Sequence, residues 1–419
     1  MKKSIFYLLF LFAFNFIYGQ TNVSGGLFSN TTWDINGSPY IVTDDVALFP
    51  GYTLTIDPGV IVKFDSEKKL IIRGLFICNG LDNNMITFTS NDSSPTVGIW
   101  DGIKIENAQG GKLIGSYIYG EYADQFIRIM DTSNGEVLNL NNSEFKYNNF
   151  VFYGKDGSSS HQVVLDYLSV SENISAFIYA QNVTLTNSVF SDGEKGIHGW
   201  EPNPNIFISD CEFYNFSVYP FNLEGVIDNC HIHDNAVGIK MKPNLIVKNS
   251  TIEFNTIGIA DDYPIPISGA NIYDNKICDN TEYNFKHYYS YPITIANNCW
   301  CSEIEDEISE TIYDGYDNVD LGIVTFSPFN VDCSSSLATN DVSDNLNKIV
   351  FYPNPSKNII YFENDSFKYI EVYSINGILI KKEIAENNLD ISELYRGVYI
   401  MKIYNEDKTN YSLVRLLKD

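Results

Sequence analysis

Basic residues are scarce in this sequence of 419 residues. Its 27 lysines and arginines stand against 53 aspartates and glutamates, so the formal net charge is −26. Nucleic-acid phosphates and anionic membrane surfaces repel a chain of this charge. We therefore expect no nucleic-acid partner.

Long apolar runs are missing beyond the first residues. Lys2 and Lys3 precede an apolar run from Ile5 to Tyr18, which ends at the small residue Gly19. The run is too short and wrongly flanked for a spanning helix, so residues 1–19 are predicted to be a signal peptide. The remaining sequence holds no segment long enough to cross a bilayer, which predicts a mature chain that has no transmembrane segment and is soluble after export.

Helix patterns and local catalytic motifs are absent as well. The sequence contains no G-x-S-x-G, H-E-x-x-H, P-loop or EF-hand motif, and it has five histidines in all. No convincing amphipathic helix follows residue 19. Tyr, Phe and Asn are abundant instead, with aromatic residues at 14%. This composition is typical of stacked β-structure with polar turns.

A repeat of about twenty residues runs through the centre of the sequence. Its reference positions are Ser143, Leu168, Ser188, Cys211, Cys230, Ser250 and Ala270. The residues two places after them are all apolar: Phe145, Val170, Phe190, Phe213, Ile232, Ile252 and Ile272. So are the residues three places before them: Leu140, Leu165, Leu185, Ile208, Ile227, Val247 and Ile267. Because the neighbours at odd offsets vary freely, each repeat is predicted to form strands with one face buried against stacked repeats.

Asparagine marks the turns of this repeat. Asn or Asp stands one place before most reference positions, at Asn142, Asn187, Asp210, Asn229 and Asn249. Asn also stands five places after them, at Asn148, Asn173, Asn235, Asn255 and Asn275. Asn tolerates left-handed backbone, and its amides can pair between stacked turns. The predicted fold is therefore all-β, a right-handed parallel β-helix rather than a leucine-rich repeat, whose Leu-rich consensus is missing.

Seven cysteines in an exported chain indicate disulfides. Cys211 and Cys230 share one position in neighbouring repeats, so they are either bridged or two reduced thiols in a column of small buried residues. Four more gather at the end of the repeat, where one or two bridges are expected to hold the last coil: Cys278, Cys299, Cys301 and Cys333. Cys299 and Cys301 are too close for the usual structural zinc spacing, so neither a metal nor another cofactor is expected.

Outward positions one and three places after the reference residues form the candidate site. Three consecutive repeats supply Glu212 and Tyr214, His231 and His233, and Thr251 and Glu253, and Tyr273 follows in the next repeat. If the stripe is catalytic, His231, His233, Glu212 and Glu253 are the candidate acids and bases. If it binds sugars, the candidates are Tyr214, Tyr273 and His233. The simplest interpretation is a solvated face, and the lack of Arg or Lys in the stripe disfavours a lyase acting on uronic acids.

The last 72 residues, 348–419, carry motifs of their own. The residues alone indicate a small immunoglobulin-like β-sandwich of about seven strands. In order and spacing, the runs Phe351 to Pro355, Ile370 to Ile380 and Leu389 to Ile400 resemble the type A C-terminal sorting domain of the Bacteroidetes type IX secretion system. The resemblance implies recognition by the type IX secretion machinery and export across the outer membrane. It also implies removal of the domain as the cargo is released or anchored to the surface.

The flanks of the repeat resemble a second family. Pro50 to Phe64 and Trp100 to Ile105 are similar to the first coils of bacterial secreted β-helix repeat proteins, and Asn297 to Cys301 is similar to their terminal coil. In that coil a Gly usually follows the Trp, where this chain has Cys301. The predicted organisation is a signal peptide (1–19), an N-terminal cap segment (20–45), a parallel β-helix (46–333), a linker (334–347) and the sorting domain (348–419).

The β-helix hosts lyases, hydrolases, epimerases and adhesins, so the fold alone assigns no activity. We expect a protein that is secreted or held on the outer-membrane surface of a Gram-negative bacterium after passage through the periplasm. The preferred function is a non-catalytic adhesin or glycan-binding protein whose partners are extracellular glycans. The alternative is a polysaccharide lyase or another carbohydrate-active enzyme, such as a glycoside hydrolase, with its site around His231 and His233.

Overall fold

The computed structural model describes most of the chain in two units, Met1–Leu337 and Ala338–Asp419. The described residues are 19–130, 135–154, 161–199, 205–261, 270–333, 351–352, 356–362, 367–374, 379–384, 388–405 and 411–418. The predicted signal peptide, apart from Gly19, and the predicted linker at 334–347 lie outside them.

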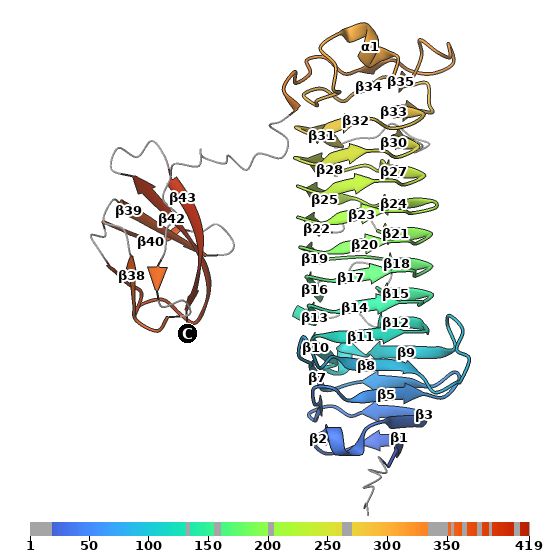
Figure 1. The fold of residues 1–419 in the computed structure, drawn as a ribbon, viewed down its shortest axis with the longest axis vertical. Helices are drawn as coiled ribbons and strands as arrows, with labels where there is room; N and C mark the ends of the chain where they lie inside the picture. Colours follow the sequence, from blue (N-terminus) through green and yellow to red (C-terminus); the bar gives the residue numbers. More distant parts are fainter. Residues whose placement is uncertain are drawn as a thin grey trace, which may run out of the picture. The chain divides into compact units, whose positions relative to one another are not determined.

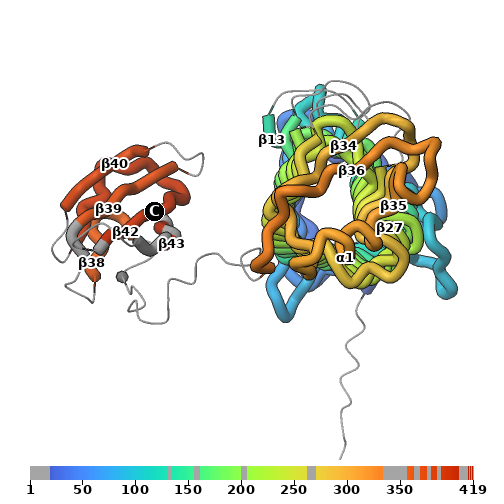
Figure 2. The backbone as a smooth tube through the Cα atoms, turned by 90° about the horizontal axis from the view of Figure 1, so that it is seen from above, coloured from blue at the N-terminus to red at the C-terminus, as the bar shows by residue number. Residues whose placement is uncertain are grey.

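The first unit is a right-handed parallel β-helix whose coils stack upon one another (Figure 1) and overlay when viewed along the stack (Figure 2). Its 11-stranded sheet contains β2 (Thr31–Trp33), β4 (Thr53–Ile56), β7 (Leu75–Asn79), β10 (Lys112–Ser116), β13 (Gly135–Asn141), β16 (His161–Asp166), β19 (Val183–Thr186), β22 (Ile206–Ser209), β25 (Gly225–Asp228), β28 (Leu245–Lys248) and β31 (Asn271–Tyr273). The predicted fold class is therefore confirmed.

Two further stacks of parallel strands complete the coils. One contains β5 (Ile61–Phe64), β8 (Ile86–Ser90), β11 (Ile118–Glu121), β14 (Glu144–Lys146), β17 (Ser169–Ser171), β20 (Val189–Ser191), β23 (Glu212–Tyr214), β26 (His231–His233), β29 (Thr251–Glu253) and β32 (Lys276–Cys278). The other contains β1 (Thr21–Leu27), β3 (Tyr40–Leu48), β6 (Lys69–Ile72), β9 (Trp100–Ile105), β12 (Ala123–Ile129), β15 (Phe150–Tyr153), β18 (Ser175–Ile178), β21 (Lys195–His198), β24 (Tyr219–Asn222), β27 (Val237–Lys240), β30 (Ile257–Asp261), β33 (Tyr283–His287) and β35 (Ile312–Tyr313). Strand β3 pairs with both β5 and β6, which joins these two stacks into one 23-stranded sheet.

Parallel stacking already begins in the segment expected as a cap. Strand β1 pairs with β3, and β2 pairs with β4, both in parallel. Residues 20–45 thus contribute strands to the same sheets as the later coils, together with the 3₁₀ turn η1 (Ile35–Gly37). A second 3₁₀ turn, η2 (Asn107–Gln109), separates β9 from β10.

The interior is built from columns of apolar side chains that repeat from coil to coil. The inward residues of β14 to β29 are fully buried and lie directly over one another: Phe145, Val170, Phe190, Phe213, Ile232 and Ile252. Within this column, the rings of Phe190 and Phe213 stack with centroids 5.0 Å apart. Burial of each such side chain stabilises the fold by roughly 1.5–3 kcal/mol, and a single coil gains it only through its neighbours.

The predicted register is wrong in the last repeat. Ile252 pairs with Ile277 rather than with Ile272, and Ile272 pairs with Val247 on the other sheet. The repeat is 25 residues long here, since Ser250 N–H donates to the side chain of Asn275, which takes the reference position in place of Ala270. The two inward positions of a repeat are five residues apart. Ile267, Ile272 and Ile277 are also five residues apart, so Ile272 can occupy either inward position.

The two predicted sets of asparagines have different roles. Those one place before the reference positions have left-handed backbone, with φ of 48° at Asn142, 49° at Asn187, 52° at Asn229 and 51° at Asn249. Those five places after them are buried and pair between coils, except that Asn275 lies at the reference position and Asn280 takes its predicted place in the column. Asn255 Oδ1 accepts from the backbone N–H and from Nδ2 of Asn235, at 3.0 and 2.8 Å. Its Nδ2 donates to the carbonyls of Ile232 and Glu253, both at 3.0 Å.

Irregular structure ends the solenoid. Short strands β34 (Ile293–Thr294) and β36 (Val324–Thr325) pair in parallel, and the helix α1 (Glu305–Ser309) lies beyond the last coils (Figure 1). Ile308 of α1 is buried and belongs to the same apolar core as the coils.

The second unit consists of two antiparallel sheets. One contains β37 (Phe351–Tyr352), β38 (Ile359–Phe362) and β41 (Asn388–Asp390). The other has the order β40 (Leu379–Glu383), β39 (Phe367–Ser374), β42 (Gly397–Asn405) and β43 (Tyr411–Lys418). Residues of both sheets share one apolar core, including Ile360, Leu389, Val372 and Met401. The predicted immunoglobulin-like β-sandwich of seven strands agrees with this arrangement.

Ile232→Asp should strongly destabilise the solenoid. The side chain is fully buried between Phe213 and Ile252, so the carboxylate would have no partner and should cost several kcal/mol or become protonated. The same substitution at Thr184, which faces outward on β19 between the uncharged residues Val164 and Phe207, should stay within about 0.5 kcal/mol. Equal shifts of the two urea-unfolding midpoints would contradict the assigned inward and outward faces.

Asn255→Ala should destabilise the solenoid through lost hydrogen bonds. The change removes the hydrogen bonds that the Asn255 side chain makes to the carbonyls of Ile232 and Glu253 and to the N–H of Asn235, at about 1–3 kcal/mol for each buried group that is left unsatisfied. The matched control is Asn271→Ala, at an exposed position of β31, which should have little effect on the same unfolding curve. A negligible effect of Asn255→Ala would mean that the amide column does not stabilise the coils.

Candidate functional site

The candidate site lies on the outer face of β23, β26 and β29. The strand register aligns Glu212 with His231 and Thr251 in one outward column. It aligns Tyr214 with His233 and Glu253 in the next. Adjacent strands lie about 4.8 Å apart, so the side chains of neighbouring coils are in contact range.

His233 is held by contacts on both ring nitrogens. Its Nε2 lies 3.1 Å from Glu212 Oε1, and its Nδ1 lies 2.6 Å from Asp234 Oδ2. The ring stacks on Tyr214 with centroids 5.2 Å apart and planes inclined by 9°. Asp234 follows β26 with left-handed backbone (φ 56°), so it belongs to the turn rather than to the outward columns.

His231 is held by the next coil. Its Nε2 lies 3.1 Å from Glu253 Oε1, and its Nδ1 lies 3.8 Å from Glu212 Oε1. Lys276 Nζ donates to the other oxygen of Glu253 at 2.7 Å. Burial raises the pKa of Glu253, but the hydrogen bonds and charges of Lys276 and His231 outweigh it, so this pKa lies below its ordinary value. Glu253 is therefore an anion at neutral pH, held between two cationic or proton-donating partners.

Five of the six predicted catalytic and binding residues meet in this cluster, and two expectations about its edges are wrong. Tyr273 lies on β31 in the 11-stranded sheet, paired with Lys248, and is not part of the stripe. The strand that follows β29 is β32, so Lys276 pairs with Thr251 and brings a basic side chain into a stripe expected to contain none. Both errors follow from the five-residue shift of the last repeat.

The cluster is a surface feature rather than a cleft. The side chains of Glu212 and His231 are 42% and 40% exposed, while those of His233 and Glu253 are 15% and 13% exposed. A shallow hollow of about 470 Å³ adjoins it, lined in part by Asp210, Glu212, Asn229 and His231. Chemically, the arrangement offers one aromatic platform, two imidazoles and carboxylates that accept hydrogen bonds.

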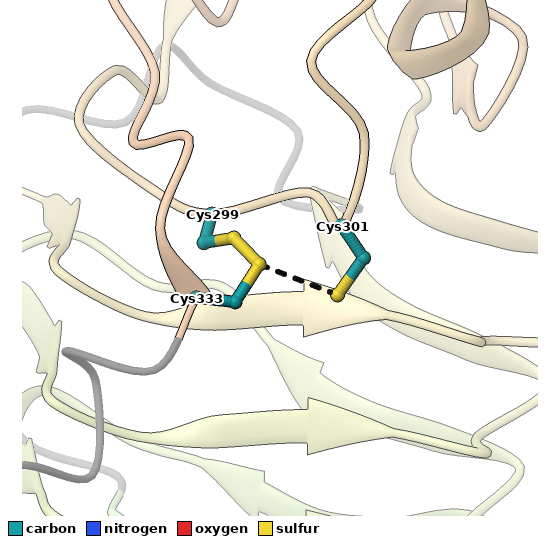
Figure 3. A group of neighbouring side chains, drawn as sticks. All are labelled: Cys299, Cys301 and Cys333. Carbon is teal, nitrogen blue, oxygen red and sulfur yellow. Dashed lines mark hydrogen bonds between the residues drawn. A yellow bond between two sulfur atoms is a disulfide. The ribbon is translucent and has the colours of Figure 1, made fainter.

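The four cysteines at the end of the solenoid form two disulfides, Cys278–Cys301 and Cys299–Cys333. Figure 3 shows the second bridge beside Cys301, whose Sγ lies 3.6 Å from Cys333 Sγ. The two bridges span sequence separations of 23 and 34 residues, for which loop-closure entropy corresponds to about 3–4 kcal/mol each. Cys301 has left-handed backbone (φ 59°), the conformation that favours Gly at the position where the similar β-helix proteins have it.

Cys211 and Cys230 are buried free thiols. Their Sγ atoms lie 3.1 and 3.3 Å from the carbonyls two residues earlier, of Ser209 and Asp228. The Ser250 hydroxyl makes the same bond to Lys248 at the same position of the next coil. Burial raises the pKa of the Cys230 thiol well above its ordinary value, which keeps it protonated. Of the two alternatives left by the sequence, the structure shows the reduced column.

Comparisons with known families match two regions of the chain. Residues 173–304 match the right handed beta helix region, and residues 350–414 match the secretion system C-terminal sorting domain. The strand stacks continue on both sides of the first match, from β1 to β35. Neither the curated proteins nor the solved structures gave a match.

None of the helices in the described part of the chain is long and apolar enough to span a membrane. The sorting domain indicates export to the cell surface or the medium, and with it an interaction with the secretion machinery. The chain is therefore a right-handed parallel β-helix protein that carries a C-terminal sorting domain of the type IX secretion system, the system of the Bacteroidetes.

Proposed function

We propose that this protein is a non-catalytic glycan-binding or adhesive cargo, and that it recognises extracellular glycans through the face of β23, β26 and β29. The observation that carries the proposal is the stack of Tyr214 on His233 beside exposed Glu212. An aromatic face stacks on a sugar ring, and carboxylates and imidazoles exchange hydrogen bonds with its hydroxyls. The open surface suits a long polymer better than a small ligand.

The charge distribution supports binding over lyase chemistry. A lyase acting on uronic acids needs a free cation to neutralise the substrate carboxylate. Lys276 enters the stripe beside Thr251, and its ammonium is already bound to Glu253 at 2.7 Å. The two histidine–glutamate pairs still favour one second candidate, a carbohydrate-active enzyme in which His233 or His231 transfers a proton.

The proposed route begins at residues 1–19, which act as a signal peptide for passage into the periplasm. Residues 348–419 then address the folded protein to the type IX secretion machinery. This division of labour is supported by the separate apolar cores of the two units, since each can fold around its own interior.

Deletion of residues 348–419 should leave the solenoid folded but confined to the periplasm. Its core contains no residue of the second unit, so its thermal unfolding should be unchanged. Fractionation and surface proteolysis of intact cells measure the location of the protein. A fusion of residues 348–419 to an unrelated periplasmic protein is the control and should be exported. Normal surface display of the truncated chain would contradict the assignment.

Tyr214→Ala should weaken glycan binding about 2–10-fold, the range expected for loss of one aromatic contact. Tyr273→Ala is the matched control, because Tyr273 lies on a different sheet and should have no effect. Binding is measured on a glycan array and then by titration with the best ligand.

His233→Ala separates the two candidate functions. Binding should weaken modestly if the face only binds, whereas cleavage, seen as new unsaturated or reducing ends, should vanish if the face is an active site. Polysaccharide cleavage by the wild-type protein that is lost in this variant would overturn the non-catalytic proposal.

Equal glycan affinities of the Tyr214→Ala and Tyr273→Ala variants would mean that the glycan binds elsewhere.

A further inference from the structure

Three residues of the outer face bring potential metal-ligand atoms together. Glu212, His231 and His233 each offer one such atom, and these three atoms lie within 4.8 Å of one another. Glu212 Oε1 is 3.1 Å from His233 Nε2 and 3.8 Å from His231 Nδ1. Two ligands that each lie about 2.0–2.1 Å from a tetrahedral zinc ion are about 3.3 Å apart, between these two distances.

The remaining ring nitrogens already have partners. His233 Nδ1 faces Asp234 Oδ2 at 2.6 Å, and His231 Nε2 faces Glu253 Oε1 at 3.1 Å. A neutral imidazole carries one N–H, so donation to these carboxylates leaves His233 Nε2 and His231 Nδ1 with free lone pairs. A histidine that binds a metal typically donates its other N–H to a carboxylate in this way.

The local charge also favours a cation. The carboxylates of Glu212, Asp234 and Glu253 contact the two rings, and the ammonium of Lys276 is bound to Glu253. In the tautomers that donate to Asp234 and Glu253, two imidazole nitrogens with lone pairs lie 3.1 and 3.8 Å from one oxygen of Glu212. A proton in the His233–Glu212 hydrogen bond or a bound cation relieves the repulsion between these electron-rich atoms.

We propose that Glu212, His231 and His233 bind a divalent first-row transition metal, of which Zn²⁺ is the best fit. Two imidazoles and one carboxylate match the ligands that zinc takes, whereas Ca²⁺ and Mg²⁺ prefer oxygen donors. Glu212 and His231 are partly exposed, so a fourth position is open to water or to an external oxygen ligand. Asp234 and Glu253 act as positioning residues that orient the two rings.

The sequence spacing alone predicts no metal at this place. The ligands come from two strands that are 19 residues apart at Glu212 and His231, and only the parallel register brings them together. The site does not depend on the proposed glycan binding, because its evidence is the convergence of the donor atoms. Either proposal can fail without the other.

The test is calorimetric titration of the full mature chain with ZnCl₂, without an affinity tag and with the disulfides intact. We expect one zinc per chain and no displacement by an equal concentration of Ca²⁺. Asp234→Asn keeps a residue that tolerates left-handed backbone and removes the charge, and should weaken binding about 10–100-fold. Glu212→Gln and His233→Ala should weaken it at least as much. Titration with Co²⁺ should give visible absorption bands that the same variants lose.

Glu144→Gln is the matched control. Glu144 occupies the same outward column as Glu212 three coils earlier, where it pairs with Lys146 and has no histidine beside it. The Glu144→Gln variant should bind zinc like the wild type. Circular dichroism and thermal unfolding check that each variant is folded. Because Glu212 is partly exposed, Glu212→Gln still tests the site if a histidine variant does not fold. No zinc binding at millimolar concentration, equal affinity for Ca²⁺, or equal losses in Glu144→Gln and Glu212→Gln would overturn the proposal.

Discussion

Parallel stacking in register is the constraint on which the rest of this structure depends. Because each strand lies about 4.8 Å from its equivalent in the next coil, the side chains of each strand lie beside the corresponding side chains of the neighbouring coils. Apolar columns such as Phe190, Phe213 and Ile232 then bury one another without any long-range connection. The same rule fixes the outer face, where Glu212 meets His231 and Tyr214 meets His233 only through the register.

Stacking also allows polar groups in the interior. A buried asparagine is costly unless both its donors and its acceptor are bonded, and the coil above and the coil below supply these partners for Asn255. Buried polar side chains at the reference positions are also hydrogen-bonded. Ser188, Cys211, Cys230 and Ser250 each direct a hydroxyl or thiol at the carbonyl two residues earlier, so oxygen and sulfur can substitute for one another there.

The sequence predicts the coils because inward residues recur in two fixed positions per repeat, and it predicts five members of the candidate cluster for the same reason. It does not predict the length of the last repeat, since Ile272 satisfies either inward position and the register is settled by the buried amide of Asn275. For that reason the sequence places Tyr273 in the stripe and leaves Lys276 out of it. The pairing of the four terminal cysteines depends on the path of the chain outside the repeat, for which the period carries no information. Asp234 lies inside the repeat, at a turn position where Glu172 and Asp192 also have left-handed backbone, but the period does not show that its carboxylate contacts His233.

The acidity of the chain gives the outer columns a particular difficulty. Stacking places equivalent residues in adjacent coils, so two carboxylates in one column would repel by roughly 1–4 kcal/mol between bulk-water and protein-surface screening. The chain avoids this on the candidate face by placing a different group beside each carboxylate: His231 follows Glu212, and Lys276 of the next coil binds Glu253. With 27 basic residues against 53 acidic ones, such partners are in short supply. Where a neutral histidine takes the place of a lysine, one ring nitrogen keeps a lone pair beside the carboxylates. The residues that separate the carboxylates in the stack therefore also supply ligand atoms for a bound cation.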